Sequence, residues 1–134
     1  MEETFQLEIV TPDKLVVDDR AEEMQIPGKN GYLGVLPGHA PLITELAVGE
    51  ISYRRGGITQ RLAVAWGFAE VLPEKVTILA QTAERADEID AARAQRARER
   101  AQARLKSGDP DTDFPRAQTA LERALARLEV VGKR

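Results

Sequence analysis

The stretch VTILAQTAERADEIDAARAQRARERAQARL, residues 76–105, contains the change of pattern that decides the fold. Its first nine residues follow a turn at residues 73–75 and are typical of a β-strand. Beyond Ala83 the apolar and charged residues recur every three or four positions, which indicates a helix. We therefore expect an α+β chain, with a strand-rich domain over residues 1–85 and a helical domain over residues 86–134.

The residues before this stretch have the short strands and turns of an antiparallel sandwich or barrel. TFQLEIV (4–10) alternates apolar and polar residues, so one face of this strand is expected to be buried. GEISYRR (49–55) and ITQRLAVAWGFAEVL (58–72) flank Gly56-Gly57, and two glycines tolerate the positive φ of a hairpin turn. Gly67, inside the second run, predicts a bulge or a close approach of another backbone.

The first helix has two candidate N-caps, Thr82 and Asp87, and is expected to end near Lys106. Gly108 can terminate it, and Pro110 prevents its continuation. Because the loop that follows is short, a second helix is expected to fold back and form an antiparallel hairpin.

The second helix, from Phe114 to about Val131 with Thr112 or Asp113 as cap, has one coherent apolar face. That face contains Phe114, Ala117, Leu121, Ala124, Leu128 and Val131. The matching face of the first helix contains Ile89, Ala94, Ala97, Ala101 and Leu105. Alanine buries little area, whereas a leucine-sized side chain contributes about 2 kcal/mol. We therefore expect the hairpin to be marginal alone and to need the sandwich, a ligand or a partner.

Arginines recur on both helices at comparable heights. With a turn near residues 109–110 and a rise of about 1.5 Å per residue, five of them fall within about 10 Å along the hairpin. They are Arg93, Arg96, Arg100, Arg123 and Arg127. Either they form a solvated face with i,i+4 ion pairs, or they form a seat for a polyanion, because the guanidinium group suits phosphate oxygens. The spacing does not name the anion.

Composition excludes several classes of protein. The net charge of −3 does not favour a dedicated nucleic-acid binder, and a chain without cysteine has no thiolate metal site. No apolar run approaches the roughly 20 residues that span a bilayer, and the first residues do not resemble a secretory leader. His39 is the single histidine, and no nucleophile, zinc or P-loop pattern is present. We therefore predict no catalytic site.

Four segments resemble the epsilon subunit of bacterial F-type ATP synthase, and the resemblance covers the whole chain. They are GYLGVLPGHAPLITEL (31–46), GEISY (49–53), VTILAQTAERADEIDAARA (76–94) and DFPRAQTALERALARL (113–128). The resemblance implies an N-terminal antiparallel β-sandwich followed by a C-terminal two-helix hairpin.

It also implies a function. The chain would be a non-catalytic central-stalk subunit of the rotor, bound to the gamma subunit and the c-ring, in a proton-transporting complex at the cytoplasmic face of the bacterial cell membrane. It would couple rotation to ATP synthesis and inhibit ATP hydrolysis when the hairpin extends toward the alpha and beta subunits. It would need no cofactor and no metal, although ATP could act as a regulatory ligand that holds the hairpin folded.

The resemblance also implies site residues. Glu84, Ile89, Asp90 and Ala94 would surround the adenosine of ATP, and Arg93, Arg100, Arg123 and Arg127 would hold its phosphates. Tyr32 and His39 would contact the c-ring, although relatives often carry an acidic residue at the position of Tyr32.

Two other interpretations stay open. A stand-alone β-sandwich could bind RNA or another polyanion through the basic hairpin, although the net acidity and the 4% aromatic content disfavour it. A purely structural stalk component would bind no ligand.

Overall fold

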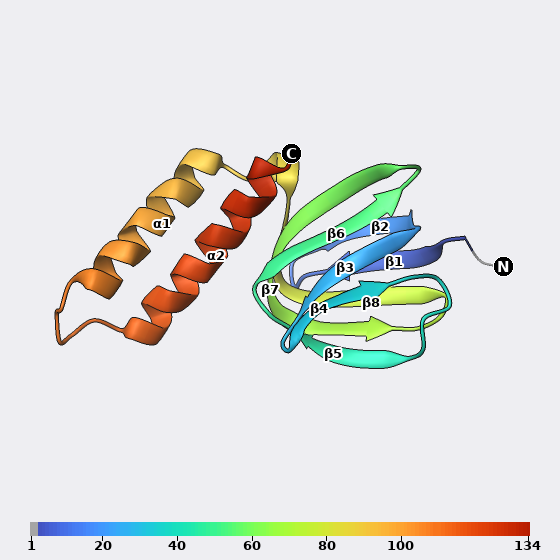
Figure 1. Cartoon of the computed structure of the whole chain (residues 1–134), viewed down its shortest axis with the longest axis horizontal. Coiled ribbons are helices and arrows are strands. Elements are labelled where there is room, and N and C mark those ends of the chain that lie inside the picture. Colours follow the sequence, from blue (N-terminus) through green and yellow to red (C-terminus); the bar gives the residue numbers. More distant parts are fainter. Residues whose placement is uncertain (1–2) are drawn as a thin grey trace.

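The computed structural model describes residues 3–134 and has a strand-rich half followed by a helical half (Figure 1). The strands are β1 (Phe5–Val10), β2 (Leu15–Ala21), β3 (Glu23–Gly28), β4 (Gly31–Val35), β5 (Leu42–Leu46), β6 (Gly49–Arg55), β7 (Ile58–Val71) and β8 (Lys75–Arg85). A 3₁₀ turn, Ala86–Glu88, leads to the helices α1 (Ala91–Lys106) and α2 (Phe114–Gly132). The expected α+β class, a β-sandwich followed by a helical hairpin, is confirmed.

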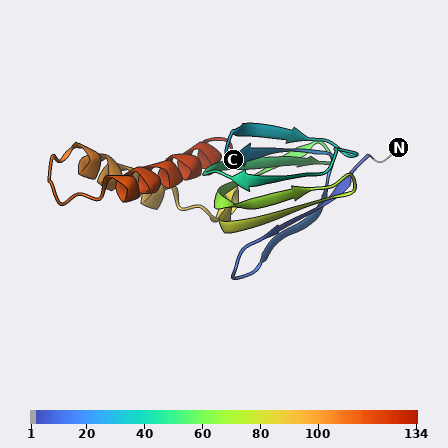
Figure 2. The ribbon, with the colours of Figure 1, turned by 90° about the horizontal axis from the view of Figure 1, so that it is seen from below.

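The strands form one continuous sheet that folds over itself into two layers (Figure 2). Its order is β2-β1-β8-β7-β5-β3-β4, and β6 pairs with β3 and β7. The pairings in the described chain are antiparallel except for β1 with β8, which run parallel. One edge of β7 pairs with two strands, with β6 along its first half and with β5 along its second half.

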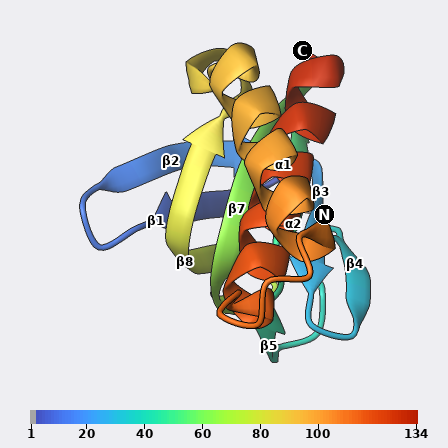
Figure 3. The ribbon, with the colours of Figure 1, turned by 90° about the vertical axis from the view of Figure 1, so that its left-hand side faces the viewer.

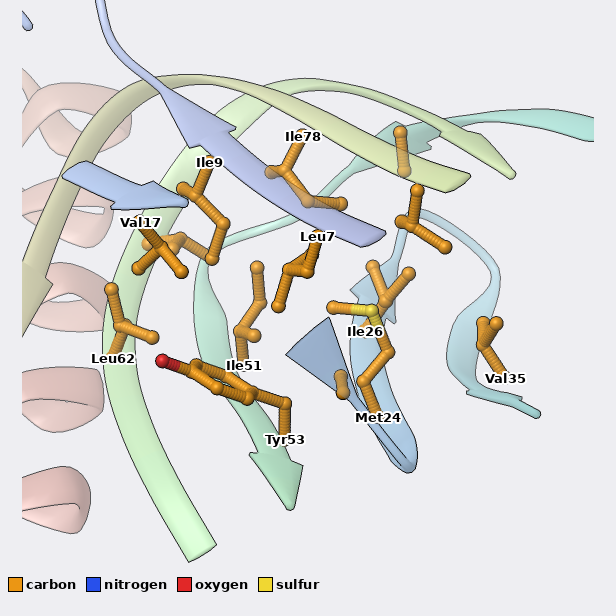
Figure 4. Close-up of a cluster of buried hydrophobic side chains, with 14 of the residues drawn as sticks. Leu7, Ile9, Val17, Met24, Ile26, Val35, Ile51, Tyr53, Leu62 and Ile78 are labelled. Atoms are coloured by element: carbon orange, nitrogen blue, oxygen red, sulfur yellow. The ribbon is translucent and has the colours of Figure 1, made fainter. Parts of the chain in front are cut away.

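All eight strands contribute buried side chains to a common core, many of which Figure 4 shows. Phe5, Leu7 and Ile9 of β1 are fully buried, as their spacing predicts. The same cluster includes Ile51 and Tyr53 of β6, and its buried members all lie between residues 5 and 80. The sandwich therefore has a core to which neither helix contributes.

The predicted hairpin at Gly56-Gly57 is confirmed. Both glycines have positive φ, 58° and 77°, and the flanking residues Arg55 and Ile58 pair across the turn. Of the two alternatives for Gly67, the structure has the close backbone approach. The β7–β8 register is unchanged on its two sides, which rules out an inserted residue, and the backbone of β8 leaves no room for a side chain at Gly67.

The helix caps differ in part from the expectation. Asp90 caps α1 by accepting a hydrogen bond from the Arg93 amide at 3.1 Å, so the candidates Thr82 and Asp87 were wrong. Thr82 lies inside β8, because that strand continues to Arg85. Asp113, one of the two candidates for α2, caps that helix through the amide of Arg116.

The two helices pack on each other through alanines, and α2 lies between α1 and the sandwich (Figures 1 and 3). Ala94, Ala101, Ala117 and Ala124 are buried, as expected for the seam. Phe114 was wrongly placed on the seam, because it is 46% exposed at the far end of the hairpin.

A second face of α2 packs on the sandwich, and the sequence pattern did not predict it. Ala126 and Val130 form a small buried cluster there with Ala63 of β7 and Ile89, the residue just before the Asp90 cap. This cluster is the main apolar contact between α2 and the sandwich within the described residues.

Candidate functional site

A cavity of about 490 Å³ lies where α1, α2 and the end of β8 meet. We call it the arginine pocket; its lining residues are Glu84, Glu88, Asp90, Arg93, Ala94, Ala97, Arg100, Ala120, Arg123 and Arg127. They include seven of the eight residues that the family resemblance implied for ATP. The eighth, Ile89, is 4% exposed and belongs to the cluster that docks α2 on the sandwich.

Three elements bring these side chains together. Glu84 is the penultimate residue of β8, and Asp90 is the cap from which α1 starts. Arg93 and Arg100 lie two turns apart on α1, whereas Arg123 and Arg127 lie one turn apart on α2. Arg96 is exposed on α1 and does not line the pocket.

The two α2 arginines are held by the sandwich. The Arg127 guanidinium donates to the Glu84 carboxylate, with Nη2 to Oε1 at 2.6 Å and Nε to Oε1 at 2.7 Å. The Arg123 guanidinium carbon lies 5.5 Å from the centre of the Trp66 ring, within the range of a cation–π contact. Each of these arginines is therefore fixed by a residue of a neighbouring strand.

The two α1 arginines are different. Arg93 and Arg100 are exposed, and within residues 3–134 their side chains make no hydrogen bond or ion pair. The glutamates that could have paired with helix arginines, Glu99 and Glu122, instead accept hydrogen bonds from Gln95 and Gln118. The contacts of the described residues thus do not form the solvated lattice of i,i+4 ion pairs.

The charge of the pocket favours an anion. Its four arginines face the three carboxylates of Glu84, Glu88 and Asp90, which leaves one net positive charge. Guanidinium groups bind phosphate oxygens through paired N–H donors, and Arg93 and Arg100 have these donors free within the described chain. Ala94, Ala97 and Ala120 provide the small apolar part of the wall. The arrangement is chemically suited to a phosphate-bearing ligand.

A larger hollow, of about 620 Å³, lies at the loop that joins the helices. Asp109, Asp111 and Asp113 line it together with Arg104 and Arg116, and none of the predicted site residues is among its lining. Within residues 3–134 no group of His, Cys, Asp or Glu side chains is arranged to hold a metal ion.

The C-terminal end of α2 is held by contacts that the sequence pattern did not reveal. The Lys133 ammonium donates to the Glu50 carboxylate at 3.1 Å, and Arg61 donates to the same oxygen at 3.2 Å. The hydrogen bond to Glu50, followed by the one to Glu129, raises the pKa of Lys133 above its ordinary value. Arg134 donates to the carbonyl oxygens of Ala86 and Ile89. No local signal could identify these contacts, because Glu50 and Lys133 are 83 residues apart.

Tyr32 and His39 lie outside the arginine pocket. Tyr32, on β4, is 59% exposed, and its hydroxyl accepts a hydrogen bond from the Glu50 amide at 3.1 Å. His39, in the β4–β5 loop, has Nδ1 2.7 Å from the Ala40 carbonyl oxygen. Their contact with a c-ring stays a prediction. Neither described helix combines the length and apolar character that crossing a bilayer requires.

Comparisons with known proteins agree with this architecture. A family model described as "ATP synthase, Delta/Epsilon chain, beta-sandwich domain" matches residues 4–86, and one described as "ATP synthase, Delta/Epsilon chain, long alpha-helix domain" matches residues 87–132. The ATP synthase epsilon chain of Koribacter versatilis is 70% identical over 111 residues, which cover 83% of this chain and 78% of that one. The ATP synthase epsilon chain of Geotalea daltonii is 48% identical over 134 residues, covering 99% and 97%.

Solved structures give the same result. A chain in the cryo-EM structure of the Euglena gracilis mitochondrial ATP synthase, OSCP/F1/c-ring, superposes with a TM-score of 0.84 at 26% identity. The match covers 96% of this chain and 81% of that one. A chain from the central stalk/c-ring structure of the Tetrahymena thermophila mitochondrial ATP synthase has a TM-score of 0.55 at 13% identity, and it supports the fold alone.

Proposed function

The chain belongs to the ATP synthase delta/epsilon family, as an epsilon chain of an F-type ATP synthase, and on that premise we propose that it is a regulatory rotor subunit whose hairpin responds to ATP. In this proposal the sandwich binds the gamma subunit and the c-ring of a proton-transporting complex at the cytoplasmic face of the bacterial cell membrane. The subunit is not catalytic. It transmits rotation, and it reaches the membrane only through the complex.

The regulatory part of the proposal concerns the hairpin. Folded on the sandwich, it permits ATP hydrolysis; extended toward the alpha and beta subunits, it inhibits hydrolysis. ATP binds the arginine pocket and stabilises the folded form, because the pocket exists only while α1, α2 and β8 lie together.

One observation carries the proposal: Arg93, Arg100, Arg123 and Arg127, which come from two helices, line a single cavity. The adenosine is assigned to the Glu84, Asp90 and Ala94 side. Ile89 supports that side from the buried cluster rather than from the cavity lining.

Calorimetric titration of the isolated protein with ATP tests the proposal. We expect a dissociation constant between about 1 μM and 1 mM for the wild type. Arg93→Ala should weaken binding about tenfold or more, since a hydrogen bond to a charged group contributes about 1.5–3 kcal/mol. Arg93 has no side-chain partner within the described residues, so its removal breaks no contact of the fold shown there.

Arg96→Ala is the matched control. It removes the same charge from the same helix, outside the pocket, and should leave the dissociation constant unchanged. Equal heats for the wild type and Arg93→Ala would rule out the arginine pocket as the ATP-binding site. No heat from any of the three proteins would favour a purely structural stalk component.

A further inference from the structure

Trp66 has a backbone conformation that needs a reason. Its φ of 50° is the one positive value of a non-glycine residue within residues 3–134. The left-handed region is unfavourable for a bulky side chain and persists only where the surroundings impose it. The next residue, Gly67, also has a positive φ, of 120°.

This conformation changes which face of β7 points inward. Leu62 and Val64 point into the core before Trp66, and Ala69 and Val71 point into the core after it. Simple alternation from Val64 would therefore place the Trp66 ring in the core. Instead the side chain is half-buried, and its ring faces Arg123 of α2.

Arg123 thus has two neighbours of different kinds, because it lines the arginine pocket and also lies over the Trp66 ring. The aromatic face attracts the cation without neutralising it, in contrast to Glu84, which pairs with Arg127 as a carboxylate. The ring therefore orients the Arg123 guanidinium and leaves its positive charge available to an anion.

We propose that Trp66 is a positioning residue of the arginine pocket: its ring holds Arg123 against β7, so that anion binding and docking of the hairpin on the sandwich are coupled. An anion that binds the oriented Arg123 engages a helix already fixed to the sandwich. Conversely, when the hairpin leaves the sandwich, Arg123 loses its orientation and the anion loses affinity. This inference rests on the proposed function, since it takes the anion to be ATP.

The variants Trp66→Phe and Trp66→Leu test it. Neither new side chain is branched at Cβ, and both pay a similar cost at positive φ, so the pair differs chiefly in the presence of an aromatic face. In calorimetric titrations we expect Trp66→Phe to bind ATP within about threefold of the wild type, and Trp66→Leu to bind about three- to tenfold more weakly. Phe68→Leu, a change two residues away and outside the pocket lining, is the control and should leave affinity unchanged.

A second measurement needs no ligand. Trp66 is the single tryptophan of the chain, so tryptophan emission reports the surroundings of this ring alone. In Arg123→Gln we expect stronger quenching by acrylamide and emission at longer wavelength, because the ring loses its cover. Arg96→Gln removes an arginine that does not line the pocket and should behave as the wild type.

The outcomes separate the two proposals. If the wild type binds no ATP, the proposed function fails, while quenching that rises in Arg123→Gln but not in Arg96→Gln still supports the role of Trp66. Equal ATP affinities for Trp66→Leu and Trp66→Phe, or equal quenching in Arg123→Gln and the wild type, would overturn that role.

Discussion

Gly67 shows how a single position constrains the sandwich. A Cβ placed on it would lie 1.8 Å from the carbonyl oxygen of Leu79, which is backbone and cannot rotate away. Its φ of 120° is also a region that side chains other than glycine rarely adopt. The two costs can be separated, because Gly31 has a similar φ of 126° and nothing within 4 Å of its ideal Cβ.

We therefore predict that Gly67→Ala lowers the free energy of unfolding by about 2 kcal/mol more than Gly31→Ala does. Gly31→Ala is destabilised only by its backbone conformation, whereas Gly67→Ala must also push β8 away from β7. Urea denaturation of both variants and the wild type measures the difference. Equal losses would show that steric contact with Leu79 does not restrict this position.

Among the helices, α2 alone carries both the seam and the docking surface. One face packs on α1 through Ala117 and Ala124, and another packs on the sandwich through Ala126 and Val130. The seam is formed by alanines and the docking cluster has four buried residues, so both bury little area and we expect them to hold the hairpin weakly. Weak docking is what a hairpin with two states requires, since a ligand can shift the balance only by its differential affinity.

Val130→Ala should loosen the hairpin without unfolding the sandwich. The loss of two buried methyl groups at a fully buried position costs about 1–2 kcal/mol. Amide hydrogen exchange should accelerate in α1 and α2 by about five- to thirtyfold and stay unchanged in β1 and β8. Leu125→Ala, at a position 42% exposed on the same helix, is the control and should leave exchange unaltered. Acceleration of the strands to the same extent would mean that both parts open as one unit.

The molecule as a whole consists of a sandwich with its own hydrophobic core and a helical hairpin attached to it. The main hydrophobic cluster lies within the sandwich, while the hairpin touches it through a cluster of four buried residues and the charged contacts of Glu50, Glu84 and the C-terminal residues. Removal of the hairpin therefore exposes little of the sandwich core.

Truncation after Ala86 should leave a folded sandwich that still binds the gamma subunit. In reconstituted enzyme it should no longer inhibit ATP hydrolysis, because the proposed inhibitory element is missing. Circular dichroism checks the fold, co-purification with gamma checks binding, and steady-state hydrolysis rates check inhibition. Inhibition equal to that of the full chain would show that the hairpin is not the inhibitory element.

Much of the architecture was predictable from sequence, because near neighbours encode it. Alternation marked β1, paired glycines marked the β6–β7 turn, and the change of period after Ala83 marked the hairpin. Resemblance to a family supplied seven residues of the arginine pocket, and the helical spacing of the arginines already put its four arginines at one level.

Other features depended on distant parts of the chain meeting in space. The parallel pairing of β1 with β8 and the packing of Ile89 in one cluster with Ala63 of β7 leave no local pattern. The turn of Trp66 away from the core toward Arg123 even contradicts the local pattern. Local periodicity determines whether a residue lies in a strand or a helix, because it reflects which face of that element can be buried. The tertiary structure determines which residues that face contacts, because only packing brings residues dozens of positions apart into contact.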